Sequence, residues 1–389
     1  MTADRSRGGA WPTPTQELLL RAALERGRAA NEHWQAWKQV SDLSHLDTSS
    51  ERLLPLVYRN LSGQGSSDPV VESLKGLYRA TWFKNQLLFG RAAAVLGGMK
   101  ARDIPTVVFK GAPLAVDYYR DLGVRPMSDV DVLVPRRDAL RCVTHLVDAG
   151  WRPVDYPWTK GLSSRAYYQA RSSLNLVDSD GFEVDLHWSS FSLWPAMTDE
   201  EEVWSAARPF RLQGVETLAL TPTDLLLMVC VHGARWHPTP LLRWIADAAT
   251  LLRESGSEID PDRLVRLALK HEVVTPLRVA LRYLQDRRFA DVPEVWLKAL
   301  EGVKASRTDG LRHGALAHFP GPIGIAVKFW YWYLGYRRLR GGPSFLGLPI
   351  DVFEFLRYRW GLESVWRIPA SGVERALIRL RRLGGWTSP

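Results

Sequence analysis

Alternating apolar and polar positions predict short strands in the middle of the chain. Residues 104–109 are apolar and largely β-branched, and Lys110-Gly111 follows them. From residue 129 to 134 every second position is a valine, so one face of this strand is apolar. Residues 172–188 predict a hairpin whose second strand alternates in the same way. The central part of the chain therefore predicts a small sheet.

A helical period predicts the regions on both sides of this sheet. The expected helices cover residues 15–38, 50–61, 68 to about 101, 112–120, 136–149, 198–207, 221–236 and 241–254, with more helices in 261–303 and 321–385. Two have clear starts, because Asp68-Pro69 and Thr221-Pro222 place a capping residue before proline. Asp224 would favour the positive end of the second of these helices.

The predicted fold class is α+β, a small mixed sheet flanked by N-terminal and C-terminal helical regions. Four regions are expected. They are an N-terminal helical region (1–103), the sheet core (104–195), a further helical region (196–303) and a basic, aromatic-rich helical region (304–389). At 389 residues the chain is long enough for two or three packed units.

Asp129 and Asp131 carry the strongest chemical signal in the chain. Residues at i and i+2 of a strand point to the same face, so the two carboxylates lie side by side. Two neighbouring acidic groups repel each other and are costly to desolvate. A divalent cation compensates for both effects, and hard oxygen ligands select Mg²⁺ or Mn²⁺.

The turn before this strand suits an anion. Gly111 allows a tight turn and a close approach of a ligand to the backbone. The predicted helix over 112–120 begins there, and free N–H groups at a helix start favour an anion such as a triphosphate. Lys110 adds a cation beside them, and Arg125 follows in the loop before the carboxylate strand.

A third carboxylate is expected on the strand over residues 182–188. Glu183, Asp185 and His187 share its polar face, opposite Phe182, Val184, Leu186 and Trp188. Asp185 is central and is the preferred ligand, with Glu183 as its rival. His187 could orient a carboxylate, contact a phosphate or form an ordinary hydrogen bond.

Together these motifs resemble the polymerase-β-like nucleotidyltransferases, which have a glycine turn, a helix, an Asp-x-Asp strand and a later carboxylate. Within that superfamily the chain is most similar to the uncharacterised nucleotidyltransferases, which carry Lys-Gly in place of Gly-Ser. The resemblance extends over residues 17 to about 255 and includes the stretches at 221–228 and 241–247. One departure is Ala112, which stands where many relatives offer a hydroxyl to the phosphates.

The resemblance implies transfer of a nucleoside monophosphate from ATP or another NTP to an acceptor hydroxyl, with release of pyrophosphate. It implies two Mg²⁺ (or Mn²⁺) ions at Asp129, Asp131 and Asp185. The nucleotide contacts that it implies are Lys110, Gly111, Arg125, Ser128 and His187. The acceptor stays open among a small molecule, a sugar, a peptide natural product, a protein side chain and a tRNA end.

The resemblance also places Asp247 on the acceptor side of the cleft, as a candidate base or substrate clamp. His232, His237 and Asp247 could form a second metal site, but their spacing fits no zinc pattern and favours structural packing. Residues 159–171 have an ambiguous pattern, and a substrate-facing loop is one interpretation of it.

Composition bears on location and partners. The two cysteines, Cys142 and Cys230, predict no disulfide framework, and the first 16 residues lack an apolar signal core. No apolar stretch is long enough to span a bilayer. These features predict a cytoplasmic protein and leave peripheral association with a membrane open.

The net charge of +9 is concentrated in residues 301–389, which hold 14 Lys and Arg against six Asp and Glu. There an aromatic run at 329–336 leads into Arg337, Arg338 and Arg340. Such a pattern suits RNA, a membrane surface or a core helix with a solvated basic side. The alternatives to catalysis are therefore a nucleotide- or RNA-binding member without activity and a peripheral membrane protein of surface-polymer assembly.

Overall fold

The computed structural model describes residues 9–154, 162, 167–168, 171–190, 201–235, 237, 239–318, 326, 329–330, 333, 348–360 and 362–374. The chain divides into two compact units. The first contains Met1–Leu133, Phe182–Val184 and Asp199–Lys328, and the second contains Val134–Gly181, Asp185–Thr198 and Phe329–Pro389. Helices and seven strands make up these residues, which confirms the predicted α+β class.

The first unit contains a mixed sheet in the order β2-β1-β7-β6. Its strands are β1 (Val107–Phe109), β2 (Asp129–Leu133), β6 (Arg208–Leu212) and β7 (Val215–Ala219). β1 is antiparallel to β2 and parallel to β7, and β6 pairs with β7 as a hairpin. Gln213 and Gly214, both at positive φ, form the two-residue turn of that hairpin.

The strands of the second unit follow the order β3-β4-β5. These strands are β3 (Arg152–Pro153), β4 (Ser173–Val177) and β5 (Glu183–His187), and the predicted hairpin over 172–188 is confirmed. The boundary between the units falls within β5, because Glu183 and Val184 belong to the first unit. Trp188 is fully buried after β5, and its indole N–H donates to the carbonyl oxygens of Tyr168 and Arg171.

Helices make up most of the first unit. In chain order they are α1 (Pro14–Leu24), α2 (Gly27–Val40), η1 (Leu43–His45), α3 (Thr48–Glu51), α4 (Leu54–Ser62), α5 (Pro69–Ser73), α6 (Lys75–Lys100), α7 (Gly111–Pro113), η2 (Leu114–Tyr118), α10 (Glu201–Ala206), α11 (Pro222–Gly233), α12 (Arg243–Ser255), η5 (Gly256–Glu258), α13 (Pro261–Lys270), α14 (Val274–Asp286), α15 (Glu294–Gly302) and α16 (Arg307–His318). The second unit holds η3 (Arg136–Asp138), α8 (Ala139–Asp148), α18 (Leu348–Arg359) and η7 (Val365–Arg367).

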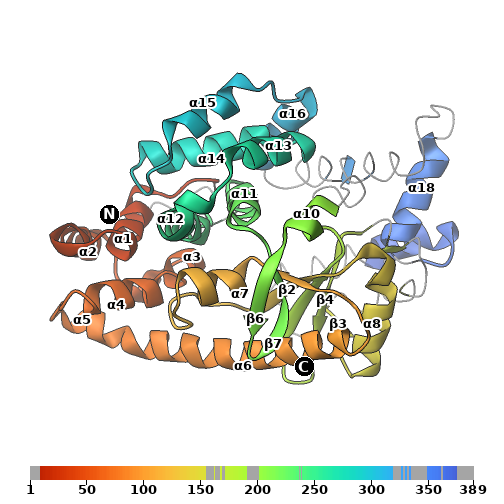
Figure 1. The fold of residues 1–389 in the computed structure, drawn as a ribbon, viewed down its shortest axis with the longest axis horizontal. Coiled ribbons are helices and arrows are strands. Elements are labelled where there is room, and N and C mark those ends of the chain that lie inside the picture. Colours follow the sequence, from red (N-terminus) through yellow and green to blue (C-terminus); the bar gives the residue numbers. More distant parts are fainter. Residues whose placement is uncertain are drawn as a thin grey trace. The chain divides into compact units, whose positions relative to one another are not determined.

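Helix α6 supports the sheet of the first unit. It contacts β2, β6 and β7, and Figure 1 shows it (orange) running along β6 and β7. The predicted helix over 68–101 is divided at Leu74, which ends α5 and precedes α6. Leu74 is buried, and its N–H bonds to the carbonyl oxygen of Val71 rather than continuing the helical ladder. The fully buried Asn85 of α6 donates to the carbonyl oxygens of Leu122 and Arg125 and so fixes the loop before β2.

Asp68 joins α2 to α5. Its carboxylate caps α5 through the N–H of Val70 and accepts hydrogen bonds from Trp34 and Lys38 of α2. Burial opposes ionisation of this carboxyl, but the Lys38 ammonium and the other donors lower the pKa of Asp68 to about 2. The carboxylate therefore stabilises the folded chain at neutral pH.

We expect Asp68→Ala to lower the free energy of unfolding by about 2 kcal/mol at pH 7, because a cap, a buried indole partner and an ion pair are lost together. The folded pKa of about 2 lies below the usual 3.8, so this contribution is present above about pH 4 and is lost as pH falls towards 2. Denaturant unfolding across that range measures it. Equal pH dependence of the wild type and the variant between pH 4 and 2 would contradict this role.

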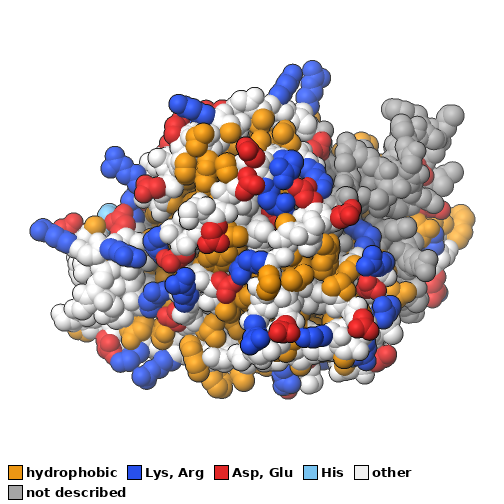
Figure 2. Space-filling view, viewed as in Figure 1, with side chains coloured by type: hydrophobic (Ala, Val, Ile, Leu, Met, Phe, Trp, Pro, Cys, Tyr) orange, Lys and Arg blue, Asp and Glu red, His pale blue; other side chains and the backbone are white. Residues whose placement is uncertain are grey.

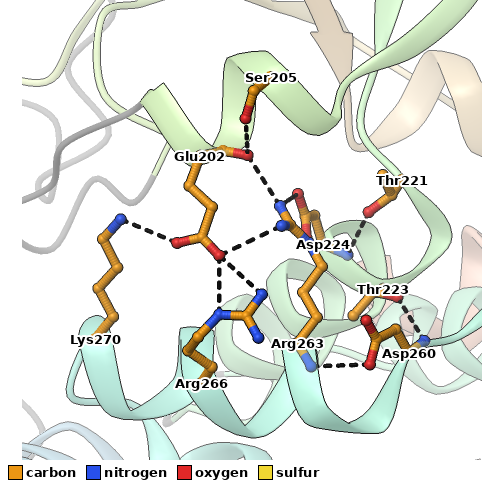
Figure 3. Close-up of polar contacts among 9 residues, drawn as sticks. All are labelled: Glu202, Ser205, Thr221, Thr223, Asp224, Asp260, Arg263, Arg266 and Lys270. Carbon is orange, nitrogen blue, oxygen red and sulfur yellow. Dashed lines mark hydrogen bonds and ion pairs between the residues drawn. The ribbon is translucent and has the colours of Figure 1, made fainter.

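A charged network fixes α11 within the first unit (Figure 3). Arg263 of α13 donates to both carboxylate oxygens of Asp224, at 2.7 and 2.8 Å. Glu202 of α10 accepts hydrogen bonds from Arg266 and Lys270, which also belong to α13. As predicted, Thr221 caps α11, and its hydroxyl oxygen accepts from the N–H of Asp224. These contacts hold α10, α11 and α13 together.

Candidate active site

The carboxylate pair lies on β2. Asp129 is half-buried and Asp131 is 5% exposed. Val130, which lies between them, and Val132, which follows them, are buried, as the alternation predicts. The β1–β2 register places Phe109 opposite Asp131, so the residue after Phe109 begins next to this carboxylate. An antiparallel pair of buried strands therefore fixes where the two carboxylates lie.

Lys110 makes the turn that was expected of Gly111. It has φ 55° and ψ −112°, and its Nζ lies 2.5 Å from Oδ1 of Asp131. Gly111 has no positive φ, but it is needed for a different reason. A Cβ there would lie 2.6 Å from Nη1 of Arg125 and 2.7 Å from the sulfur of Met127. The glycine thus permits close packing, and a positive φ at a lysine is uncommon enough to mark a constrained site.

The helix after the turn begins at Gly111, as predicted, but it is not a regular α-helix. One short turn, α7, is followed by the π-helical turn η2, in which the N–H of Tyr119 bonds to the carbonyl oxygen of Leu114. Single π turns inside helices occur frequently at functional sites. Ala112 is buried and has only a methyl side chain, so this position offers no hydroxyl.

Arg125 and Asp247 form a buried ion pair beside the turn. Nε and Nη2 of Arg125 lie 3.0 and 2.8 Å from the two carboxylate oxygens, and the hydroxyl of Tyr119 donates to Oδ1. Burial alone would lower the pKa of Arg125, but the Asp247 carboxylate outweighs it and raises that pKa. Burial, reinforced by Asp247, raises the pKa of Tyr119 well above 10. Asp247 is thus engaged by three protein donors and positions Arg125.

A cavity of about 250 Å³ in the first unit opens onto these groups. Its wall includes Lys110, Gly111, Arg125, Asp129 and Asp131, all of which sequence reasoning had selected. It also includes Arg52, Arg235 and Arg243, to which the sequence assigned no role. Arg52 and Arg235 belong to no motif, and Arg243 lies in the 241–247 stretch, where only Asp247 was considered. The cavity wall therefore combines the carboxylates of Asp129, Asp131 and Asp247 with a larger number of Lys and Arg side chains.

The polar face of β5 contains one short contact. His187 is 2% exposed, and its Nε2 lies 2.9 Å from Oδ2 of the half-buried Asp185. This contact is compatible both with a histidine that orients a carboxylate and with an ordinary hydrogen bond. Glu183 is half-buried.

Other predicted residues are placed as follows. The Ser128 hydroxyl lies 3.4 Å from Oδ1 of Asp129. His232 and His237 are exposed; Nε2 of His232 accepts from Arg235, and Nδ1 of His237 lies 2.7 Å from the carbonyl oxygen of Thr239. Among the described residues, these histidines and Asp247 do not form a metal-ligand cluster.

Two predicted features lie largely outside the described residues. They are the loop over 159–171 and the aromatic and arginine-rich run over 329–340. Over the coloured part of the face in Figure 2, Lys and Arg side chains are interspersed with Asp and Glu. No helix within the described ranges is both long and apolar enough to cross a bilayer.

A Lys-Gly turn that opens a helix, followed by a paired-carboxylate strand facing a cationic cavity, defines a nucleotidyltransferase-like core. The model of a family described as "Uncharacterised nucleotidyltransferase" matches residues 47–288, more than half of the chain. The chain belongs to this family and is therefore assigned to the nucleotidyltransferases, enzymes that generally use a divalent metal and an NTP. The match begins later and ends later than the resemblance over 17–255.

Among solved structures, the chain is similar to an antigenic nucleotidyltransferase-like protein from Paracoccidioides brasiliensis. The identity is 16%, the alignment covers 60% of this chain and 97% of that protein, and the TM-score is 0.34. Comparison with curated protein sequences gave no match.

Proposed function

We propose that the protein is a Mg²⁺-dependent nucleotidyltransferase that moves a nucleoside monophosphate from an NTP to an acceptor hydroxyl and releases pyrophosphate. The observation that supports this most is the pair Asp129 and Asp131 on the wall of a cavity that also contains the Lys110-Gly111 turn. Family membership independently supports nucleotidyl transfer. The acceptor class proposed is a small molecule, a sugar or a peptide natural product.

The donor set fits a hard divalent cation. Asp129 and Asp131 offer carboxylate oxygens at i and i+2 of a rigid strand, and both face the cavity. Asp185 is proposed as the third carboxylate from the order of motifs in the superfamily, with His187 holding its orientation. When bound, Mg²⁺ or Mn²⁺ supplies neutralisation of phosphate charge and activation of the acceptor hydroxyl.

The chain's own groups then bind and orient the reactants. The N–H groups at the start of α7 and the Lys110 ammonium face the negative charge of the triphosphate. Asp247 holds Arg125 in place at the cavity wall, and Arg125 is proposed as a nucleotide contact through the guanidinium N–H groups that Asp247 does not engage. Ser128 is proposed as a further polar contact next to Asp129.

Labelled nucleotides test this proposal directly. Purified full-length protein is incubated with Mg²⁺, an extract of the cells that produce it, and NTPs labelled at either the α- or the γ-phosphate. We expect label from the α-phosphate to appear in a product, label from the γ-phosphate to appear in pyrophosphate, and both signals to vanish with EDTA. Transfer of the γ-phosphate label to the product, or α-phosphate transfer that persists in EDTA, would contradict the assignment.

A further inference from the structure

Three arginines on the cavity wall lack an acidic partner. They are Arg52, directly after α3, Arg235, two residues after α11, and Arg243, the first residue of α12. Within the described part of the chain, none of the three forms an ion pair with a carboxylate. Arg125 in the same cavity differs, because Asp247 neutralises it. The three guanidinium groups without an ion-paired carboxylate therefore mark a place for an anion from outside the chain.

The contacts of these arginines leave donors available. Nη1 of Arg243 donates to the carbonyl oxygen of Pro126 at 2.5 Å, and Nη2 of Arg235 donates to His232 at 3.1 Å. Each guanidinium has five N–H donors in a planar fork, so one contact to a neutral group uses a minority of them. Burial lowers the pKa of Arg243 to about 9, and the nearby Arg125 adds to this effect, which the carboxylates of Asp247 and Asp129 offset only in part. A bound anion would relieve this cost.

The start of α12 favours an anion at the same place. This helix has 13 residues, its N-cap is Leu242, and no side chain caps it. Leu242, Arg243 and Trp244 all line the cavity, so the start of the helix lies at the wall. The N-terminal end of a helix carries partial positive charge, and Arg243 adds a full charge there. The positive charge of Arg243 is therefore unfavourable at the start of this helix, unless an anion binds to both the guanidinium group and the helix N-terminus.

We propose that the acceptor carries a phosphate group, which Arg52, Arg235, Arg243 and the N-terminus of α12 bind. This inference rests on the proposed function and adds the chemical class of the acceptor. Arg52 and Arg235 follow helices and Arg243 begins one, so all three lie outside the β1–turn–β2 unit that faces the donor triphosphate. Arg243 is tied to Pro126, three residues before Asp129, so the bound phosphate lies beside the carboxylate pair. A planar guanidinium group suits phosphate, because it can donate two parallel hydrogen bonds to two phosphate oxygens.

Calorimetric titration of full-length protein tests this with inorganic phosphate as the probe. The protein is first saturated with Mg²⁺ and a non-hydrolysable NTP analogue. We expect phosphate to bind this complex and acetate to bind at least tenfold more weakly. Arg243→Gln should weaken phosphate binding tenfold or more, and Arg243→Lys should weaken it less because it keeps the charge. Arg253→Gln, an exposed arginine of the same helix, is the matched control and should change nothing.

Two outcomes would overturn the inference. One is competition between phosphate and the NTP analogue, which would assign the arginines to the donor triphosphate. The other is unchanged phosphate binding in Arg243→Gln, Arg52→Gln and Arg235→Gln, each checked for an unaltered melting temperature. Failure of the proposed function gives a different result, because the Mg²⁺–NTP analogue then does not bind. In that case, phosphate titration of the nucleotide-free protein still measures the role of the arginines.

Discussion

Asp131→Asn is expected to abolish metal-dependent nucleotidyl transfer while leaving the fold intact. The substitution removes one negative charge from the carboxylate pair and keeps the shape of the side chain. The amide oxygen of Asn can still accept the hydrogen bond that Lys110 donates. A hard divalent cation loses a charged ligand, however, and the transferring phosphate loses the neutralisation that this ligand secures. We expect the rate to fall by at least about 1,000-fold, equivalent to about 4 kcal/mol of transition-state stabilisation.

The measurement is the rate of α-phosphate label transfer at saturating Mg²⁺, with Mg²⁺ and nucleotide binding determined separately. Asp291→Asn, at an exposed aspartate of the first unit, is the control and should keep full activity. The melting temperature of Asp131→Asn should stay within a few degrees of the wild type. Activity that survives in a correctly folded Asp131→Asn protein would refute the metal assignment.

Local patterns predicted the parts of the fold that depend on neighbouring residues. The alternation in β2 and β5, the caps at Asp68 and Thr221, and the hairpin before β5 each follow from a few consecutive positions. The carboxylate pair was also readable, because a period of two is enough to place both side chains on one face. The family followed from the order of these motifs and is confirmed by the family model.

Features that depend on distant contacts could not be predicted. The positive φ of Lys110 depends on its ion pair with Asp131 and on the packing of Gly111 against Arg125 and Met127. A glycine beside a lysine is the ordinary candidate for a left-handed turn, so the sequence favoured the wrong residue. Among the cavity arginines, Arg52 lies between α3 and α4, far along the chain from Arg235, after α11, and Arg243, at the start of α12, and no periodicity connects them.

The pairing of Arg125 with Asp247 shows the same limit, because 122 residues separate them. Resemblance suggested a triphosphate contact for Arg125 and a base or clamp for Asp247. Three donors hold the Asp247 carboxylate, two from Arg125 and one from Tyr119. The pair therefore connects α12 to the segment before β2, and its main effect should be on stability.

We expect Asp247→Ala to lower the free energy of unfolding by about 3–5 kcal/mol, the second large effect. The side chains of Arg125 and Asp247 are 7% and 5% exposed, so the substitution leaves a guanidinium buried without its counter-charge. The Tyr119 hydroxyl also loses its acceptor. Since native proteins are stable by only about 5–15 kcal/mol, this change removes a large fraction of the total. Denaturant unfolding measures it, with Asp291→Ala as the exposed control.

The double variant Arg125→Met/Asp247→Leu separates the loss of a buried charge from the loss of packing. Replacing a buried ion pair by apolar residues of similar volume is often close to neutral, whereas removing one partner is not. The double variant should therefore be more stable than Asp247→Ala, although it carries more substitutions. It also covers the case in which Asp247→Ala does not fold, because the double variant should. If the losses of stability in the single variants Arg125→Met and Asp247→Leu add up to the loss in the double variant, the two charges are not coupled, and this ion pair does not hold α12 in place.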